Sequence, residues 1–283
     1  ERMNSAIKEI ISAGILKDGI MGSKWPAKIE LRRGAGGYVC GEETTLLNTM
    51  EGYRREPRLR PPFPTESGYL ASPTIINNAE TLANLPQIFA NPVSDFTAIG
   101  TDTQTGTKLI SLSGAVQRTG LAEVPFGTTL KYLIQDIGGG LPPSKSLKAI
   151  GIGGPSSGLL PPSLIDTKIS PGVLNDGGII LGAGGVIVLD DSIAIIDSVK
   201  HLADYNADES CGKCTPCREG TPKLVELIDK FIVKNATNDD LKELQTLATI
   251  IKDSSLCGLG QAAGNPVFSL IRFFNDQLLT KAN

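Results

Sequence analysis

The chain contains the stretch Glu209-Ser-Cys-Gly-Lys-Cys-Thr-Pro-Cys-Arg-Glu-Gly220 and, further on, Ser255-Leu-Cys-Gly-Leu259. Together they hold a tight triplet of cysteines and a remote fourth: Cys211, Cys214, Cys217 and Cys257. This pattern suits a [4Fe–4S] cluster, because each loop cysteine can bind one iron corner while another element supplies the fourth ligand. Structural zinc more often uses two separated pairs that converge on one ion. The spacing favours the cluster, with zinc and unliganded thiols as the alternatives.

Other chemically interesting side chains near this stretch have ordinary explanations. Lys213 and Arg218 flank the cysteines, where they either offset an anionic cluster or are solvated surface charges. Cys40 has no cysteine nearby in sequence, so we expect a small buried hydrophobic residue. His201 is the only histidine, and we expect it to pack on or lie at the surface of a helix rather than to bind metal.

Composition describes an ordinary globular chain of 283 residues, long enough for two or three compact units. The net charge of −3 gives no reason to expect nucleic acid or a membrane surface as a partner. The most apolar stretch, 177–189, is short and contains five glycines, so we expect strand and turn there rather than a membrane span. Five cysteines do not suggest a secreted disulfide framework. Cysteine usage therefore favours a cytoplasmic or equivalent reducing compartment. The first residues run directly into helical patterning, so we expect no cleaved leader.

Local patterns divide the chain into three regions. Up to Asn91 we expect part of an α/β unit with a helix over 4–13, a strand over 28–32, a helix over 42–51 and a helix capped by Asn77 or Asn78. Residues 106–191 alternate short strands with one helix, which is typical of a compact α+β domain of the ubiquitin-like β-grasp type. The expected elements there are strands at 108–114, 120–124, 148–152 and within 178–189, and a helix at 128–137.

The remainder, 192–283, has helical periodicity throughout. We expect four helices, over 193–205, 221–233, 238–252 and 266–279. In a four-helix arrangement the loop with the three cysteines and the loop with Cys257 fall at the same end of the bundle.

Two glycine-rich turns invite comparison with nucleotide sites. The turn at 34–43 stands where we expect a strand to lead into a helix, a place where backbone amides can meet a flat or anionic ligand. It matches neither a Walker loop nor a clean Rossmann fingerprint, and the helix dipole alone explains carboxylates at Glu42 and Glu43. The second turn, 151–158, imitates a phosphate loop but lacks its lysine, and an ordinary turn is the simpler interpretation.

Taken together, four blocks of sequence resemble the NADH-binding flavoprotein subunit of respiratory complex I and of related NAD-linked or electron-bifurcating hydrogenases and formate dehydrogenases: 34–44, 57–64, 77–82 and 209–220. The resemblance implies an α+β multidomain fold. Its expected parts are the C-terminal part of a Rossmann-like FMN and NADH domain at 1–91, a β-grasp (soluble-ligand-binding) domain at 105–191 and a helical [4Fe–4S] domain at 192–283. The family's first glycine-rich loop has no counterpart here, so we expect part of the flavin domain to lie outside this sequence.

The resemblance also implies roles for individual residues. The FMN pocket would be lined by residues of the first glycine-rich turn: Gly34, Gly36, Tyr38, Gly41, Glu42 and Glu43. The ribityl and phosphate side would be closed by three residues further on: Asn77, Asn78 and Thr81. Glu43 corresponds to the catalytic glutamate near the nicotinamide, and Phe63 to the aromatic ring that stacks on the NADH adenine. Arg60 stands where complex I members commonly carry a lysine, and the two residues are not interchangeable.

The implied activity is that of an NADH dehydrogenase module within a larger redox complex. Hydride would be exchanged between NAD(H) and FMN, and single electrons would pass to the [4Fe–4S] cluster. Expected partners are other redox subunits: an iron–sulfur subunit, a thioredoxin-like [2Fe–2S] subunit, and a hydrogenase or formate dehydrogenase. No nucleic acid and no direct membrane insertion are expected. The competing hypothesis is a non-catalytic iron–sulfur scaffold that docks partner subunits and has lost flavin chemistry.

Overall fold

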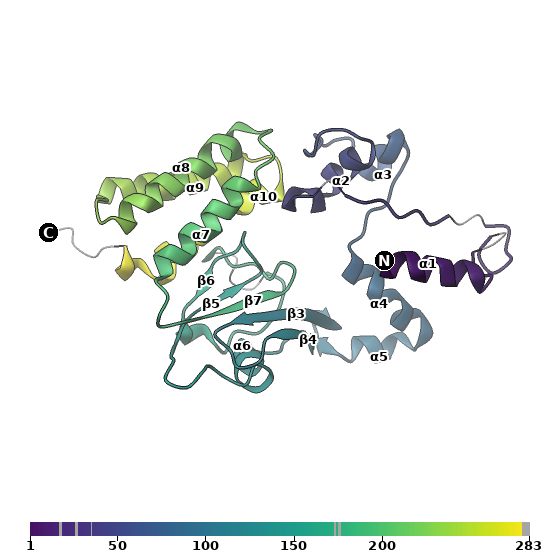
Figure 1. Cartoon of the computed structure of the whole chain (residues 1–283), viewed down its shortest axis with the longest axis horizontal. Coiled ribbons are helices and arrows are strands. Elements are labelled where there is room, and N and C mark those ends of the chain that lie inside the picture. Colours follow the sequence, from purple (N-terminus) through teal and green to yellow (C-terminus); the bar gives the residue numbers. More distant parts are fainter. Residues whose placement is uncertain (17–18, 26–27, 35, 173, 175–176, 279–283) are drawn as a thin grey trace.

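The computed structural model describes residues 1–16, 19–25, 28–34, 36–172, 174 and 177–278. Three regions follow one another along the chain (Figure 1). They are an N-terminal region of short helices, a central sheet, and a C-terminal group of longer helices. The architecture is a mixed α/β one. Within the described ranges, no helix has both the length and the apolar character needed to cross a membrane.

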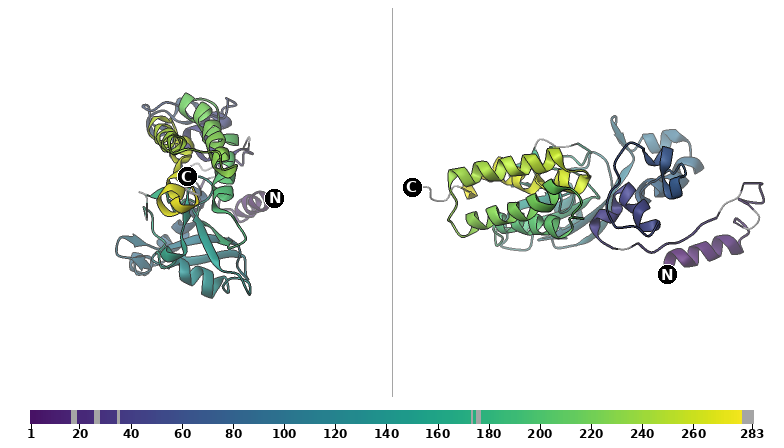
Figure 2. Two further views of the ribbon diagram at one scale, coloured as in Figure 1. Left: turned by 90° about the vertical axis from the view of Figure 1, so that its left-hand side faces the viewer. Right: turned by 90° about the horizontal axis from the view of Figure 1, so that it is seen from above.

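The N-terminal region begins with α1 (Arg2–Ser12), none of whose residues is buried. This helix extends away from the rest of the molecule (Figure 2). The elements that follow are short: η1 (Tyr38–Gly41), α2 (Glu43–Met50), α3 (Pro64–Ser67), η2 (Tyr69–Ala71), α4 (Ala79–Ala90) and α5 (Val93–Thr97). The predicted helices over 4–13 and 42–51 are confirmed, and Asn78 caps α4 by accepting a 2.7 Å hydrogen bond from the Thr81 amide. The predicted strand over 28–32 is wrong, because this segment pairs with no neighbouring strand in the described part of the chain.

The central sheet has five strands in the order β4-β3-β7-β5-β6. Their bounds are β3 (Thr107–Gly114), β4 (Gly120–Pro125), β5 (Leu147–Ile152), β6 (Leu159–Leu160) and β7 (Gly185–Asp190). Only β3 and β7 run parallel, and the other neighbours are antiparallel. The predicted hairpin and the strand at 148–152 are confirmed. The strand expected within 178–189 is β7, which starts at Gly185. The short β6 and the small pair of β1 (Gly100–Thr101) and β2 (Gln104–Thr105) were missed.

The sheet carries its own core on the side covered by α6 (Leu130–Tyr132) and η3 (Leu133–Ile137). Alternate strand residues such as Ile110, Ile150 and Val188 are fully or almost fully buried against Leu133 and Ile134. The period of two along each strand explains this alternation, because successive side chains point to opposite faces. A short η4 (Pro162–Leu164) completes this region.

The C-terminal region contains α7 (Ile195–Asp208), α8 (Thr215–Ile232), α9 (Asn238–Ser254), α10 (Gly258–Ala262), α11 (Asn265–Phe273) and η6 (Asn275–Gln277). Helix α8 packs against both α7 and α9 (Figure 2), around buried residues that include Leu224, Ile228 and Leu244. The predicted helices over 193–205, 221–233 and 238–252 correspond to α7, α8 and α9. The one predicted over 266–279 corresponds to α11, which already ends at Phe273, and residue 279 lies outside the described residues. However, α8 begins at Thr215 rather than at 221, because Pro216 is well tolerated in a first turn.

The start of α9 is held by a capping box. Thr237 accepts from the Asp240 amide, and the Asp240 carboxylate accepts from the Thr237 amide at 2.8 Å. Lys230, near the end of α8, donates to the same carboxylate at 2.6 Å. Lys230 and Thr237 together hold the pKa of Asp240 well below its usual range. One carboxylate thus links the consecutive helices α8 and α9.

Candidate functional site

Four cysteine side chains come together at one end of the helical region. Cys217 and Cys257 are buried with Val39 and Leu259, and Cys211 and Cys214 pack against this group. Cys214 is the N-cap of α8, and Cys257 is the N-cap of α10. Each of these helices therefore starts at a cysteine, and the chain reversal between α9 and α10 brings the remote cysteine to the triplet.

Burial governs the protonation of these thiols. Burial raises the pKa of Cys217 to about 11; the hydroxyl of Ser210, 3.2 Å from Sγ, opposes the rise, and the three neighbouring cysteines add to it. The pKa of Cys257 is also raised, mainly by burial, although the amides of Gly260 and Leu259 donate to its sulfur. Metal ligation requires thiolates, so a bound metal centre would have to displace these protons.

The set of possible ligands bears on the two metal hypotheses. Among the described residues, no group of three or more His, Cys, Asp or Glu side chains is arranged to hold one metal ion. Four sulfur-bearing side chains nevertheless share one buried cluster. Four sulfur ligands contributed by two separate segments suit the inorganic core of a [4Fe–4S] group. The hydroxyl of Ser255, buried next to Cys217 and without a partner, also fits a group that accepts hydrogen bonds.

The first glycine-rich turn lies directly against the cysteines. Val39 of η1 is only 4% exposed and belongs to the same buried cluster as Cys217 and Cys257. The Tyr38 amide donates to Glu209 Oε2 at 2.6 Å, and the Tyr38 ring packs edge-on against Tyr205, with centroids 5.8 Å apart. Two segments that the sequence proposed separately, as a ligand turn and as a metal loop, therefore form one continuous site.

Basic side chains strengthen this junction. Arg54 Nη2 donates to the Cys211 carbonyl at 3.3 Å, and Lys213 Nζ donates to the Pro57 carbonyl at 2.8 Å and to Glu56 at 3.2 Å. Lys213 is thus occupied in joining the two segments. Arg218 donates to the Gly212 carbonyl at 3.0 Å and so braces the cysteine loop itself.

The residues of the turn at 34–43 differ in whether they are free to contact a ligand. A methyl group added at Gly34, Gly36 or Gly41 would meet no atom within 4 Å, so bare backbone faces open space there, as close approach of a flat ligand requires. Glu42 instead turns its carboxylate into α2, accepting from the Thr44 and Thr45 amides at 3.0 and 2.8 Å. The turn therefore fits a flavin through its glycines and Tyr38 rather than through Glu42.

Arg60 contacts the end of the turn at Glu43, and Phe63 follows Arg60 by three residues. Arg60 Nη1 donates to Glu43 Oε1 at 2.5 Å, and Arg60 Nη2 lies 3.5 Å from Glu42. Phe63 is 51% exposed and precedes α3, where its amide donates to Glu66. The ring is thus held by local backbone structure while its surface stays accessible.

The remaining predicted residues are placed elsewhere. Asn77 is exposed, whereas Asn78 and Thr81 line a separate cavity of about 520 Å³ between α4 and the sheet. Glu80 and Lys108 form an ion pair in its wall; burial opposes ionisation of Glu80, but Lys108 and the Leu109 amide outweigh it and lower the Glu80 pKa. No hydrogen bond between described residues joins Asn77, Asn78 or Thr81 to the turn at 34–43. The prediction of a buried Cys40 is wrong, because η1 lies near the surface and leaves that side chain half-buried, with its thiol donating to the Gly36 carbonyl.

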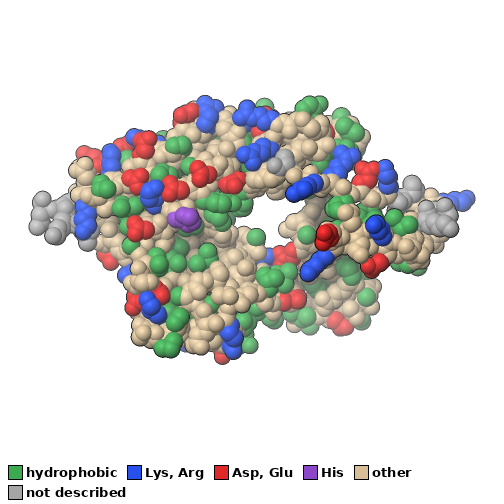
Figure 3. Space-filling view, in the orientation of Figure 1, with side chains coloured by type: hydrophobic (Ala, Val, Ile, Leu, Met, Phe, Trp, Pro, Cys, Tyr) green, Lys and Arg blue, Asp and Glu red, His purple; other side chains and the backbone are tan. Residues whose placement is uncertain are grey.

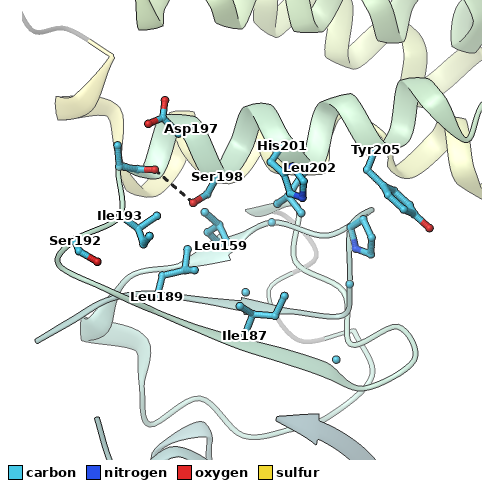
Figure 4. A pocket seen from close by; sticks show the side chains of 16 residues that line it. Leu159, Ile187, Leu189, Ser192, Ile193, Asp197, Ser198, His201, Leu202 and Tyr205 are labelled. Atoms are coloured by element: carbon cyan, nitrogen blue, oxygen red, sulfur yellow. Dashed lines mark hydrogen bonds between the residues drawn. The ribbon is translucent and has the colours of Figure 1, made fainter. Parts of the chain in front are cut away.

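One cavity escaped the sequence analysis. It encloses about 580 Å³ between α7 and the sheet and is lined mainly by apolar side chains and by glycines, including Gly151 and Gly158 (Figure 4). His201, the purple residue in Figure 3, lies at its edge beside hydrophobic side chains. Among the described residues that line this cavity there is no Lys or Arg. The signal for this cavity in the sequence was its set of glycines, which leave part of the sheet surface without side chains.

Comparison with known proteins agrees with this site. Residues 197–281 match the NADH-ubiquinone oxidoreductase-F iron–sulfur binding region, and residues 1–87 match the Nuo51 FMN-binding domain. The NADP-reducing hydrogenase subunit HndC of Solidesulfovibrio fructosivorans is 45% identical over 98% of this chain, and an NADH-quinone oxidoreductase subunit of Rhizobium meliloti (strain 1021) is 38% identical over 98%. The chain belongs to this family of flavoprotein subunits.

Structural comparison gives the same family. The crystal structure of an NAD+-reducing [NiFe]-hydrogenase in the H2-reduced state superposes with a TM-score of 0.85 at 35% identity over 98% of this chain. The chain spans 56% and 66% of the two sequence relatives and 46% of the hydrogenase chain. The family regions matched are those for FMN and for an iron–sulfur centre, two of the cofactors that the sequence predicted.

Proposed function

We propose that this chain is the cluster-bearing part of an NADH:acceptor oxidoreductase module within a multisubunit redox complex. The observation that carries the proposal is the packing of Val39, from the glycine-rich turn, with buried Cys217 and Cys257, against which Cys211 and Cys214 also pack. A flavin seated on that turn would lie next to the iron–sulfur centre. FMN, when bound, supplies the conversion between the two-electron chemistry of nicotinamide and the one-electron chemistry of an iron–sulfur centre.

Each set of residues has a distinct part in this proposal. The four cysteines bind the [4Fe–4S] cluster: Cys211, Cys214, Cys217 and Cys257. Backbone at Gly34, Gly36 and Gly41 and the ring of Tyr38 face the flavin. Glu42 acts indirectly, by capping α2 and so fixing the turn.

The NADH side is assigned to exposed residues next to the turn. Glu43 would orient the nicotinamide and Phe63 would stack on the adenine, while Arg60 holds the Glu43 carboxylate in place. We assign the ribityl and phosphate side of the flavin to Asn77, Asn78 and Thr81. This assignment requires α4 to approach the turn at 34–43, to which no hydrogen bond between described residues joins these three.

The wider setting follows the relatives. We propose domains at 1–91, 105–191 and 192–283, a cytoplasmic or equivalent reducing location, and partner subunits that carry further redox centres. The relatives named above are subunits of a hydrogenase and of NADH-quinone oxidoreductase. The non-catalytic scaffold hypothesis receives no support from these comparisons.

The test is anaerobic purification of the complete protein that contains this chain. We expect about four irons per chain from four-thiolate ligation, flavin absorbance, and an EPR signal of the cluster that appears on addition of NADH. Stoichiometric zinc without iron would overturn the cluster assignment. Iron without flavin absorbance would favour the non-catalytic scaffold.

A further inference from the structure

Ser255 is a buried serine whose hydroxyl has no hydrogen-bond partner. It ends α9 and is 7% exposed, and its Oγ is the one fully buried side-chain oxygen or nitrogen among the described residues that lacks a partner. Its backbone groups are both used: the amide donates to the Ile251 carbonyl, and the carbonyl accepts from Gln261 Nε2, each at 3.1 Å. A buried hydroxyl without a partner is destabilising, so such groups in proteins usually face something that accepts a hydrogen bond.

The Ser255 hydroxyl lies close to Gly260. A methyl group added to Gly260 would lie 2.5 Å from Ser255 Oγ and 3.1 Å from Cys217 Cβ. Ser255 and Cys217 therefore approach the same glycine, and Cys257 follows two residues after Ser255. The absence of a side chain at residue 260 leaves the serine and both buried cysteines in one small region.

A second serine beside the cysteines provides a contrast. Ser210 Oγ lies 3.2 Å from Cys217 Sγ and accepts from the Gly212 amide at 3.4 Å. Its hydrogen bonds are already made within the protein. Ser255, by comparison, keeps a free donor at the buried side of the same cysteine set.

We propose that Ser255 donates a hydrogen bond to a sulfur atom of the iron–sulfur cluster bound by these cysteines. The inference rests on the proposed function, since it requires the cluster. Reduction adds negative charge to the cluster, and a hydrogen-bond donor stabilises that charge more strongly than the oxidised form. Ser255 thereby raises the reduction potential of the cluster and makes it a better acceptor of electrons.

The experiment compares Ser255→Ala with Ser269→Ala in the complete, anaerobically purified protein. Ser269 is also buried, but its hydroxyl donates to the Pro266 carbonyl at 2.8 Å and accepts from the Leu159 amide at 3.0 Å. Redox titration followed by EPR should show a lower midpoint potential for Ser255→Ala and an unchanged one for Ser269→Ala. In the iron-free protein we expect the variant with the larger effect to be Ser269→Ala. Thermal unfolding should show destabilisation by Ser269→Ala but not by Ser255→Ala.

The outcomes separate this inference from the proposed function. Absence of iron from the wild-type protein would overturn the cluster assignment and the inference with it. A wild-type cluster whose midpoint potential is the same in Ser255→Ala would overturn the inference alone. Loss of iron from Ser255→Ala, with iron-free stability unchanged, would support the hydrogen bond, because only the loaded state would then depend on the hydroxyl.

Discussion

The backbone amide of Tyr38 donates a 2.6 Å hydrogen bond to Oε2 of Glu209, although the two residues are 171 positions apart. Glu209 is the C-cap of α7 and stands two residues before the first cysteine of the triplet. Tyr38 is the first residue of η1 in the glycine-rich turn. A hydrogen bond from an amide to a carboxylate is stronger than one between neutral groups. This contact therefore fixes the proposed flavin-facing turn to the start of the cysteine loop.

Glu209→Gln should loosen this attachment. The substitution keeps the size of the side chain but removes its charge, so the amides of η1 should exchange hydrogen faster, while those in the middle of α8 should not change. Hydrogen–deuterium exchange measures both. Glu219→Gln is the matched control, because Glu219 is exposed and forms its ion pair with the neighbouring Arg218. Equal protection of η1 in all three proteins would show that the carboxylate does not hold the turn.

Cys257→Ser should disrupt the iron–sulfur cluster. Serine keeps the shape of the side chain but replaces a soft sulfur ligand at one of four proposed iron corners. Cys40→Ser is the control, since Cys40 lies outside the buried group that contains the other four cysteines. Iron content and the EPR signal under dithionite should fall in the first variant and persist in the second. Full iron content with an unchanged EPR signal in Cys257→Ser would remove this residue from the ligand set.

Phe63→Ala should weaken NADH binding in the complete protein. Loss of an aromatic ring stacked on a base costs about 1–3 kcal/mol, so the Michaelis constant for NADH should rise while the dithionite-reduced cluster signal stays. Phe89→Ala is a suitable control, because that ring is 83% exposed and lies on α4. A Michaelis constant that is the same in wild type and Phe63→Ala would exclude the ring from the nucleotide site.

Glu42 and Glu43 should separate into a structural and a functional residue. Glu42→Ala removes the cap of α2 and should lower the free energy of unfolding by about 0.5–2 kcal/mol. Glu43→Gln keeps the helix start intact and should mainly affect turnover with NADH. Chemical denaturation and steady-state kinetics on both variants test this division. The reverse pattern, with stability lost in Glu43→Gln and activity lost in a stable Glu42→Ala, would contradict it.

Asp240 should make stability depend on pH in the acid range. Its pKa is lower in the folded than in the unfolded protein, so its contribution is present above about pH 4 and is lost as the pH falls below that value toward the folded pKa. The stability difference between wild type and Asp240→Asn should therefore be constant near neutral pH and shrink in acid. Denaturation at a series of pH values measures it. A stability difference between wild type and Asp240→Asn that stays constant down to acid pH would contradict this role of the Asp240 carboxylate.

Sequence patterns predicted local structure well where the cause was local. The Asn78 cap, the hairpin of β3 and β4 and the helical periodicity after residue 192 depend on near neighbours, and all three are present. Lys28 to Arg32 alternates like a strand, but a strand forms only with a partner, which local sequence does not supply.

The site was predictable in composition but not in arrangement. Cysteine spacing indicated the four proposed ligands, and the structure brings them together as expected. The contact of Val39 with the cysteines and the unpartnered Ser255 depend on chain segments meeting across long sequence separations. Glu42 is a residue whose motif indicated more than its geometry supports. The motif predicted that it contacts the flavin, but its carboxylate accepts hydrogen bonds from backbone amides at the start of α2.

Helices α8 and α10 each begin at a cysteine, so oxidative damage to the cluster should also damage secondary structure. Oxidation of Cys214 or Cys257 would place a bulkier, polar sulfur acid where a helix must start. We expect exposure to oxygen to fray both first turns and to make the nearby backbone a target for proteases. Proteases would then degrade chains that have lost the cluster in preference to intact ones, because loss of the cofactor causes local unfolding.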